Sequence, residues 1–193
     1  MTVTLPSFVF MAFTAAYLTI RGVFIRRARG QHKTDKGDAR DRALIALVGL
    51  GQIALPLLFV WTPALAFADR PEPTACVALG TLAMALGLWL FWRSHLDLGD
   101  NWSVTLEIDA QHRLVTRGVY RWVRHPMYTS FFVSGLGQAL LLANWIAGPA
   151  ALVTVALLVI VRLPNEEAMM IDQFGDEYRD YMRRTGGLVP RIG

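Results

Sequence analysis

Residues 126–163, PMYTSFFVSGLGQALLLANWIAGPAALVTVALLVIVRL, decide the fold of this chain. They hold two apolar runs, roughly 126–143 and 146–163, and each approaches the length of about 20 residues that a membrane-crossing helix needs. Little more than Asn144 and Trp145 separates the two runs. A break this short joins antiparallel neighbours, so we predict a tight helical hairpin within a membrane.

Three more apolar segments precede the hairpin, at roughly 6–25, 43–67 and 74–92. The whole chain of 193 residues is 54% hydrophobic and only 18% charged, which departs from the composition of soluble domains. We therefore predict an all-α integral membrane protein with about five transmembrane helices, folded as a single domain over residues 1–193.

The basic residues indicate the orientation of these helices. Seven lysines and arginines lie in 26–42, five in 93–125 and five from Arg162 onward, whereas the loops on the other side hold only Arg70. Basic loops stay in the cytoplasm, so the pattern predicts an N-out, C-in topology. Arg21 lies within the first span, near its cytoplasmic end, and we expect its side chain to extend towards the interface.

Other features narrow the class of protein. The arginines lie beside apolar segments, which favours anionic lipids over nucleic acid as the partner. The single cysteine, Cys76, allows no disulfide and is expected to be a packing residue.

His95 and His112 lack the ligand spacing of a zinc site, so we expect no metal. The first basic residue, Arg21, follows its apolar run, so we expect a retained helix and not a signal peptide.

Apolar residues recur at helical spacing near the C-terminus, in EEAMMIDQFGDEYRDYMRR (166–184). This pattern predicts an amphipathic helix that lies at the cytoplasmic interface or folds back under the bundle. Pro164 and Asn165 resemble its start, and Gly175 weakens it midway.

Two short segments carry candidate chemistry. In RGVYRWVRHPMYTS (117–130), Pro126 suits the first position of a helix, whose free N–H groups beside Arg124 and His125 could bind a carboxylate or phosphate. The alternative is a plain helix start with lipid-binding arginines. Glu166 and Glu167 follow the last span.

Neighbouring helix positions point about 100° apart, so Glu166 and Glu167 are expected to do different things. One could bind a ligand's hydroxyls or a cation, and the other could pair with an arginine such as Arg162 or Arg124. The alternative is that both simply favour the first turn of a helix.

Taken together, NWSVTLEIDAQHRLVTRGVYRWVRHPMYTS (101–130) and NEEAMMIDQFGDEYRDY (165–181) resemble the isoprenylcysteine carboxyl methyltransferase family, which is related to the membrane phospholipid methyltransferases. The likeness covers roughly residues 100–184. It implies S-adenosylmethionine as methyl donor and a lipophilic acceptor that enters from the bilayer. Residues 93–193 would then form the cofactor-binding half and residues 1–92 three transmembrane helices.

The resemblance also assigns residues to roles. Its cofactor contacts fall on His112, Leu114, Val115, Tyr120, His125, Pro126, Tyr128 and Glu166. Arg162 matches an arginine near the methyl acceptor, and Glu167 matches a second acidic position, so both are assigned to catalysis. Leu163-Pro164-Asn165 stands where prenylcysteine enzymes often carry a more acidic run, which leaves the acceptor open.

Two other functions remain open at this stage. One is a sterol-reductase-like membrane reductase that uses NADPH, and the other is a non-catalytic lipid-binding membrane protein. The methyltransferase interpretation places the protein in a bacterial inner membrane with its active site facing the cytoplasm.

Overall fold

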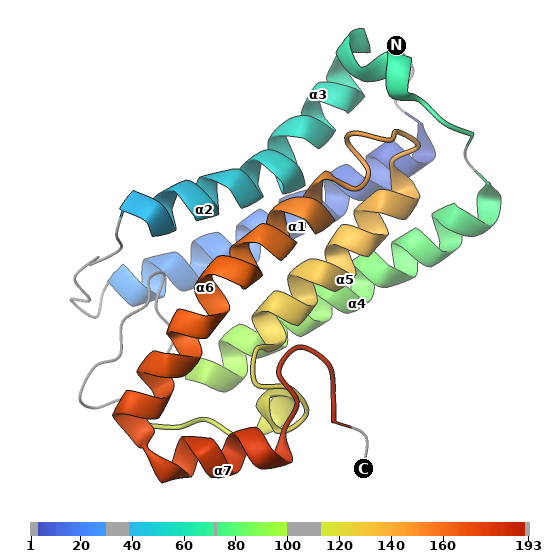
Figure 1. The fold of residues 1–193 in the computed structure, drawn as a ribbon. Coiled ribbons are helices and arrows are strands. Elements are labelled where there is room, and N and C mark those ends of the chain that lie inside the picture. Colours follow the sequence, from blue (N-terminus) through green and yellow to red (C-terminus); the bar gives the residue numbers. More distant parts are fainter. Residues whose placement is uncertain (1–3, 30–38, 72, 100–112, 192–193) are drawn as a thin grey trace.

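The computed structural model describes residues 4–29, 39–71, 73–99 and 113–191, and within them the chain is all-helical (Figure 1). The seven α-helices are α1 (Leu5–Arg29), α2 (Ala39–Gly49), α3 (Leu55–Trp61), α4 (Thr74–Leu98), α5 (Pro126–Leu141), α6 (Ala150–Phe174) and α7 (Asp176–Arg184). A π-helical turn, η1 (Leu50–Ala54), joins α2 to α3, and two short 3-10 helices, η2 (Pro63–Ala68) and η4 (Gly118–Arg121), precede α4 and α5.

Three helical stretches of the described chain are long and apolar enough to cross a membrane: Leu5–Arg27, Ala39–Trp61 and Thr74–Leu98. They confirm the first three predicted spans by length and composition, although the second ends at Trp61 and not at residue 67. Helix α5 has 16 residues and rises only about 24 Å, because the chain turns after Leu141. Helix α6 has 25 residues but carries charges in its last third.

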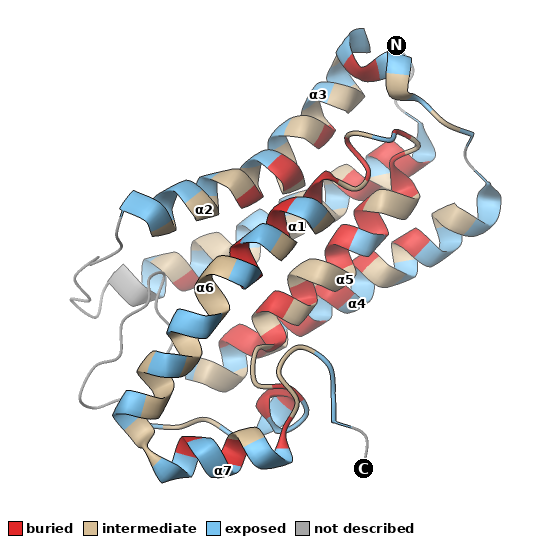
Figure 2. Ribbon diagram, in the orientation of Figure 1, coloured by how far each residue is buried: buried red, intermediate tan, exposed pale blue. Residues whose placement is uncertain are grey.

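The outward faces of the helices are exposed (Figure 2), and many of the exposed residues are large and apolar where a soluble protein would carry polar ones. Leu82 on α4 is 66% exposed and Ile160 on α6 is 69% exposed. Burial is concentrated on the inner faces of α4, α5 and α6. This arrangement suits a bundle surrounded by lipid, which agrees with the predicted integral membrane protein.

The predicted hairpin of α5 and α6 is confirmed, and Asn144 holds its turn. The side-chain oxygen of Asn144 accepts hydrogen bonds from the backbone of Ile146 (3.0 Å) and Ala147 (2.9 Å). Its amide nitrogen donates to the carbonyl of Leu65 (2.7 Å) and to Asp69 (2.9 Å), so the turn is also tied to the η2 segment. Asn144 is fully buried, and these bonds satisfy its amide.

Glycines set the spacing between α5 and its neighbours. A Cβ atom on Gly137 would lie 2.7 Å from the side chain of Met84 and 2.9 Å from the carbonyl oxygen of Gly80, both on α4. A Cβ atom on Gly135 would lie 3.0 Å from Leu152 on α6. Small residues at these positions allow the close backbone approach that is common between membrane helices.

The prediction that a new helix starts at Pro164 is wrong. Helix α6 runs through Pro164 to Phe174, and the predicted amphipathic helix is divided between its end and α7. Proline inside a helix is tolerated when neighbouring groups stabilise the turn, and the Arg162–Glu166 ion pair (2.9 Å) spans it. The break comes at Gly175, whose φ of 55° favours glycine.

Gly137→Ala is expected to destabilise the protein by about 1–3 kcal/mol, because the added methyl group overpacks the contact with α4. Gly22→Ala is the matched control, since a Cβ atom there meets nothing within 4 Å and alanine favours a helix. Thermal unfolding in detergent measures both. An unchanged midpoint for Gly137→Ala would contradict the close α4–α5 contact.

Candidate active site

A cavity of about 480 Å³ lies inside the bundle. Its charged lining residues lie near the start of α5 and on α1 and α6, and its apolar lining residues extend along α1, α2, α4 and α5 as an apolar arm. The charged end is lined by Arg21, Arg113, Arg124, His125, Arg162 and Glu166, and the arm by Phe10, Leu18, Ile45, Val48, Met84 and Phe131. The cavity therefore offers one ligand a polar environment and another an apolar one.

The short segment from Gly118 to Tyr120, within RGVYRWVRHPMYTS, places Tyr120 in the cavity wall. Gly118 has a φ of 61°, and a Cβ atom there would lie 2.1 Å from a carboxylate oxygen of Asp97. That carboxylate accepts the backbone N–H of Val119 (2.9 Å) and so fixes η4 against α4. The hydroxyl of Tyr120 donates to the carbonyl of Ser94 (3.3 Å), and burial raises the pKa of this hydroxyl.

The start of α5 is held by the C-terminal tail. The backbone N–H groups of Arg124 and His125 donate to the carbonyls of Gly186 (2.8 Å) and Gly187 (3.1 Å). Helix α5 then begins at Pro126, and its next N–H groups have no acceptor within their own helix. A helix N-terminus beside His125 is suited to binding an anion.

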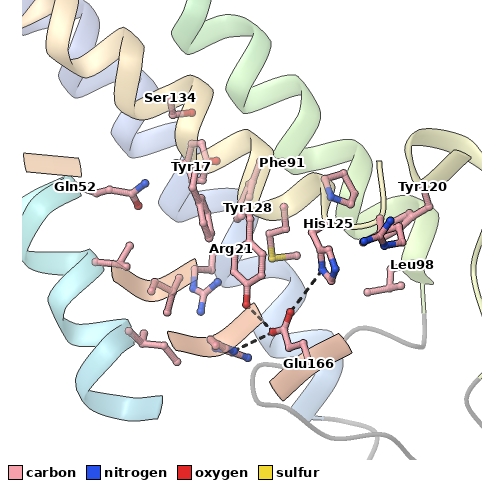
Figure 3. A pocket seen from close by; sticks show the side chains of 18 of the residues that line it. Tyr17, Arg21, Gln52, Phe91, Leu98, Tyr120, His125, Tyr128, Ser134 and Glu166 are labelled. Atoms are coloured by element: carbon pink, nitrogen blue, oxygen red, sulfur yellow. Dashed lines mark hydrogen bonds and ion pairs between the residues drawn. The ribbon is translucent and has the colours of Figure 1, made fainter. Parts of the chain in front are cut away.

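Glu166 faces the cavity and is held by two side chains from α5 and α6 (Figure 3). Its Oε1 atom accepts hydrogen bonds from the hydroxyl of Tyr128 (2.6 Å) and from Nε of Arg162 (2.9 Å). Its other oxygen lies 3.7 Å from Nδ1 of His125. The rings of His125 and Tyr128 stack with centroids 6.0 Å apart, so these groups form one wall of the charged end.

Glu167 points to different partners, as the helical angle between neighbouring residues requires. Its Oε1 atom accepts hydrogen bonds from Nη2 of Arg124 (2.6 Å) and lies 3.2 Å from Nε2 of His125. Arg124 also donates to the backbone carbonyls of Thr185 and Met182. The hydrogen bond with His125 and the bonds and charge of Arg124 lower the pKa of Glu167 to about 2.

The structure brings most of the sequence-predicted site residues together. Eight of them line the cavity: Leu114, Val115, Tyr120, His125, Pro126, Tyr128, Arg162 and Glu166. Glu167 is not part of the lining and contacts the site through Arg124 and His125. His112 lies outside the described residues. Within the described ranges, no three His, Cys, Asp or Glu side chains are grouped to hold a metal ion.

Some lining residues were missed by the sequence analysis. Arg21 on α1 belongs to the cavity wall, a place that the sequence did not assign to it. A charged residue inside a membrane span was the available signal for it. Tyr178 and Tyr181 of α7 also line the cavity, and the hydroxyl of Tyr181 donates to the backbone carbonyl of Tyr120. Their position in the lining agrees with the predicted alternative in which the C-terminal helix folds back under the bundle.

A protein-family model for the isoprenylcysteine carboxyl methyltransferase (ICMT) family matches residues 76–172, half of the chain. The chain belongs to this family. The matched segment contains most of α4, all of α5 and most of α6, and it includes His125, Arg162 and Glu166. In this ICMT-family protein, α1 and α2 lie outside the matched segment and still build the cavity wall.

Curated relatives carry the name protein-S-isoprenylcysteine O-methyltransferase. Those from Tribolium castaneum, Schizosaccharomyces pombe and Mus musculus are 34%, 33% and 36% identical over 59–60% of this chain. The matched part spans less than half the length of each of them, at 41%, 49% and 41%. The solved structure of a eukaryotic intramembrane Ras methyltransferase ICMT superposes with a TM-score of 0.64 and 25% identity, covering 98% of this chain and 69% of that one.

Glu167→Gln is expected to lower stability at neutral pH and to lose this effect in acid. Because the pKa of Glu167 is lowered from 4.5 to about 2 in the fold, its carboxylate stabilises fully above about pH 4.5. This stabilisation is lost as the pH falls towards 2. Unfolding midpoints of both proteins across this range measure the difference.

Glu177→Gln, an exposed glutamate on α7, is the control for the loss of one charge. A gap between wild type and Glu167→Gln that stays constant down to pH 2 would contradict the ion-paired state of this carboxylate.

Proposed function

We propose that this protein is an S-adenosylmethionine-dependent integral membrane methyltransferase that acts on a lipophilic small molecule or a lipid-linked acceptor. The observation that carries the proposal is a single cavity that joins a charged end to an apolar arm. A polar donor and a lipophilic acceptor need these two environments to meet. Membership of the ICMT family supports methyl transfer to an isoprenylcysteine carboxyl group as the first reaction to test.

The charged end fits S-adenosylmethionine by the chemistry of its side chains. The cavity volume falls in the range of about 300–1,000 Å³ that is usual for small-molecule sites. The aromatic faces of Tyr120 and Tyr128 suit the sulfonium cation, and the N-terminus of α5 with His125 suits the carboxylate. Glu166 suits the ammonium group or the ribose hydroxyls.

The apolar side chains of Leu114, Val115 and Pro126 would flank the remaining surface of the donor, and His112 would complete its contacts. When bound, the donor supplies an electrophilic methyl group on a sulfonium sulfur, which becomes a neutral thioether once an acceptor lone pair has taken the methyl. The protein's contribution to such a displacement is chiefly position and orientation.

Two charged side chains take different parts in this arrangement. Arg162 lines the cavity, and its Nε atom binds Glu166. Because Arg162 also matches the family arginine near the methyl acceptor, we assign it to the side of the donor pocket that faces the acceptor. Glu167 acts as a positioning residue, because it fixes Arg124 and His125 without lining the cavity.

The proposed topology has five crossings, with the N-terminus outside and the C-terminus inside, in a bacterial inner membrane. Exposed apolar residues on α5 and α6, including Leu136, Val153 and Ile160, support lipid contact for the last two helices. Helix α7 and the α5–α6 turn lie at opposite ends of the bundle (Figure 1). Arg124 donates to the carbonyl of Thr185, just after α7, whereas Arg70 donates to the carbonyl of Ala143 at the α5–α6 turn. The charged end then faces the cytoplasm, where the donor is available.

The alternatives make different predictions about ligands. A sterol-reductase-like enzyme would bind NADPH at the charged end, and a lipid-binding protein would bind neither cofactor. Calorimetry of the detergent-purified protein with each cofactor separates the three. Binding of NADPH without binding of S-adenosylmethionine would overturn the proposal.

His125→Ala and Glu166→Ala are each expected to weaken S-adenosylmethionine binding at least tenfold, about 1.4 kcal/mol. Each removes a polar group from the wall of the charged end. Titration calorimetry measures the change, and thermal unfolding checks that the variants are folded. Arg179→Ala, on the exposed face of α7, is the control. Wild-type affinity in both site variants would place the donor elsewhere.

Arg162→Ala is expected to lower turnover more than donor affinity, because this arginine is assigned to the acceptor side. The test compares kcat with a lipophilic acceptor and the dissociation constant of S-adenosylmethionine for the same purified variant. Equal losses in both quantities would instead make Arg162 part of the donor pocket.

A further inference from the structure

Helix α1 presents one continuous face to the cavity, and that face ends in a charge. Phe10, Thr14, Tyr17, Leu18 and Arg21 all line the cavity, at the three- and four-residue spacing of one helix face. From Phe10 to Arg21 the helix rises about 16 Å. An arginine at the end of an otherwise neutral wall suggests recognition of a molecule with an apolar body and an anionic head.

Arg21 differs from the other arginines of the site in its partners. Arg162 is neutralised by Glu166 at 2.9 Å, and Arg124 by Glu167 at 2.6 Å. No carboxylate in the part of the chain that the structure describes lies within ion-pair distance of Arg21. A half-buried guanidinium without an anion is costly, so the site gains most from a ligand that brings one.

The charges of the described site residues also favour an anionic ligand. Among these residues, with Arg113 left aside, three arginines face the two glutamates Glu166 and Glu167. The methyl donor carries a sulfonium, an ammonium and a carboxylate, so it adds net positive charge. An anionic acceptor is the ligand that restores the balance.

Arg21 lies at the edge of the proposed donor contacts, on the side of Tyr128 away from His125 (Figure 3). In Figure 3, Tyr128 lies between Arg21 on one side and His125 on the other, and Arg21 lies towards Tyr17 and Gln52. Gln52 lines the same arm of the cavity, on η1. The guanidinium therefore lies where the apolar arm meets the charged end.

Tyr17 fixes this position from one helical turn away. Its hydroxyl lies 3.1 Å from Oγ of Ser130 on α5, and its ring stacks on Phe91 of α4 with centroids 4.1 Å apart. These contacts hold α1 against α4 and α5, so Arg21 is presented to the cavity by a packed helix face.

We propose that Arg21 is the residue that binds the carboxylate of the methyl acceptor, while the acceptor's apolar chain follows the α1 face towards Phe10. This inference rests on the proposed methyltransferase function. It assigns a direct role in acceptor specificity to α1, a helix outside the segment that the family model matches.

The test uses the full chain in detergent with two matched probes, an S-isoprenylcysteine carboxylate and the same compound as a carboxamide. Binding of each is measured by calorimetry without donor, for wild type, Arg21→Gln and Arg21→Lys. Arg26→Gln is the control, because Arg26 is exposed on the same helix and does not line the cavity. Donor affinity is measured separately for every variant.

We expect Arg21→Gln to weaken binding of the carboxylate at least tenfold and of the carboxamide less than threefold. Arg21→Lys should restore most of the carboxylate affinity, and donor affinity should stay within twofold of wild type. With methyl donor present, KM for the carboxylate should rise more than kcat falls.

Equal weakening of both probes, or a loss confined to donor affinity, would overturn the role of Arg21. Failure of the wild type to bind S-adenosylmethionine would instead overturn the proposed function, and the donor-free titrations would still decide whether Arg21 recognises a carboxylate.

Discussion

The site depends on the polar contacts of two glutamates that join the start of α5 to the last third of α6. Glu166 binds Arg162 and Tyr128, and Glu167 binds Arg124 beside His125. Neighbouring positions on a helix point about 100° apart, so two consecutive glutamates serve two different faces. One carboxylate remains in the cavity wall, and the other anchors the segment that begins α5.

These contacts require the helices to be close, and the glycines provide that closeness. Gly137 lets α5 approach Gly80 and Met84 of α4, and Gly135 lets it approach α6. In a membrane, apolar side chains gain little by leaving lipid for a helix contact, so close packing supplies much of the association energy. The glycines and the charged end are therefore parts of one arrangement, in which packing brings the polar groups into register.

Some features could be predicted from the sequence because they follow from local chemistry. The α5–α6 hairpin followed from two apolar runs with a short break, and the start of α5 at Pro126 followed from the preference of proline for the first position of a helix. The divergence of Glu166 and Glu167 followed from helix geometry alone. The prediction of a helix start at Pro164 was wrong, because the Arg162–Glu166 pair across the proline stabilises that turn. The helix ends at Phe174 instead, just before Gly175.

By itself, the sequence determined the helical membrane character and, through resemblance, the group of residues around His125 and Glu166. Only the tertiary structure decided which side chains share a cavity. Arg21 is more than 100 positions from His125 along the chain, yet both line the same space. Apolar periodicity reports which face of a helix is buried, but it does not report which other helix covers that face. That choice is made by long-range packing between elements, here by α1 against α4 and α5.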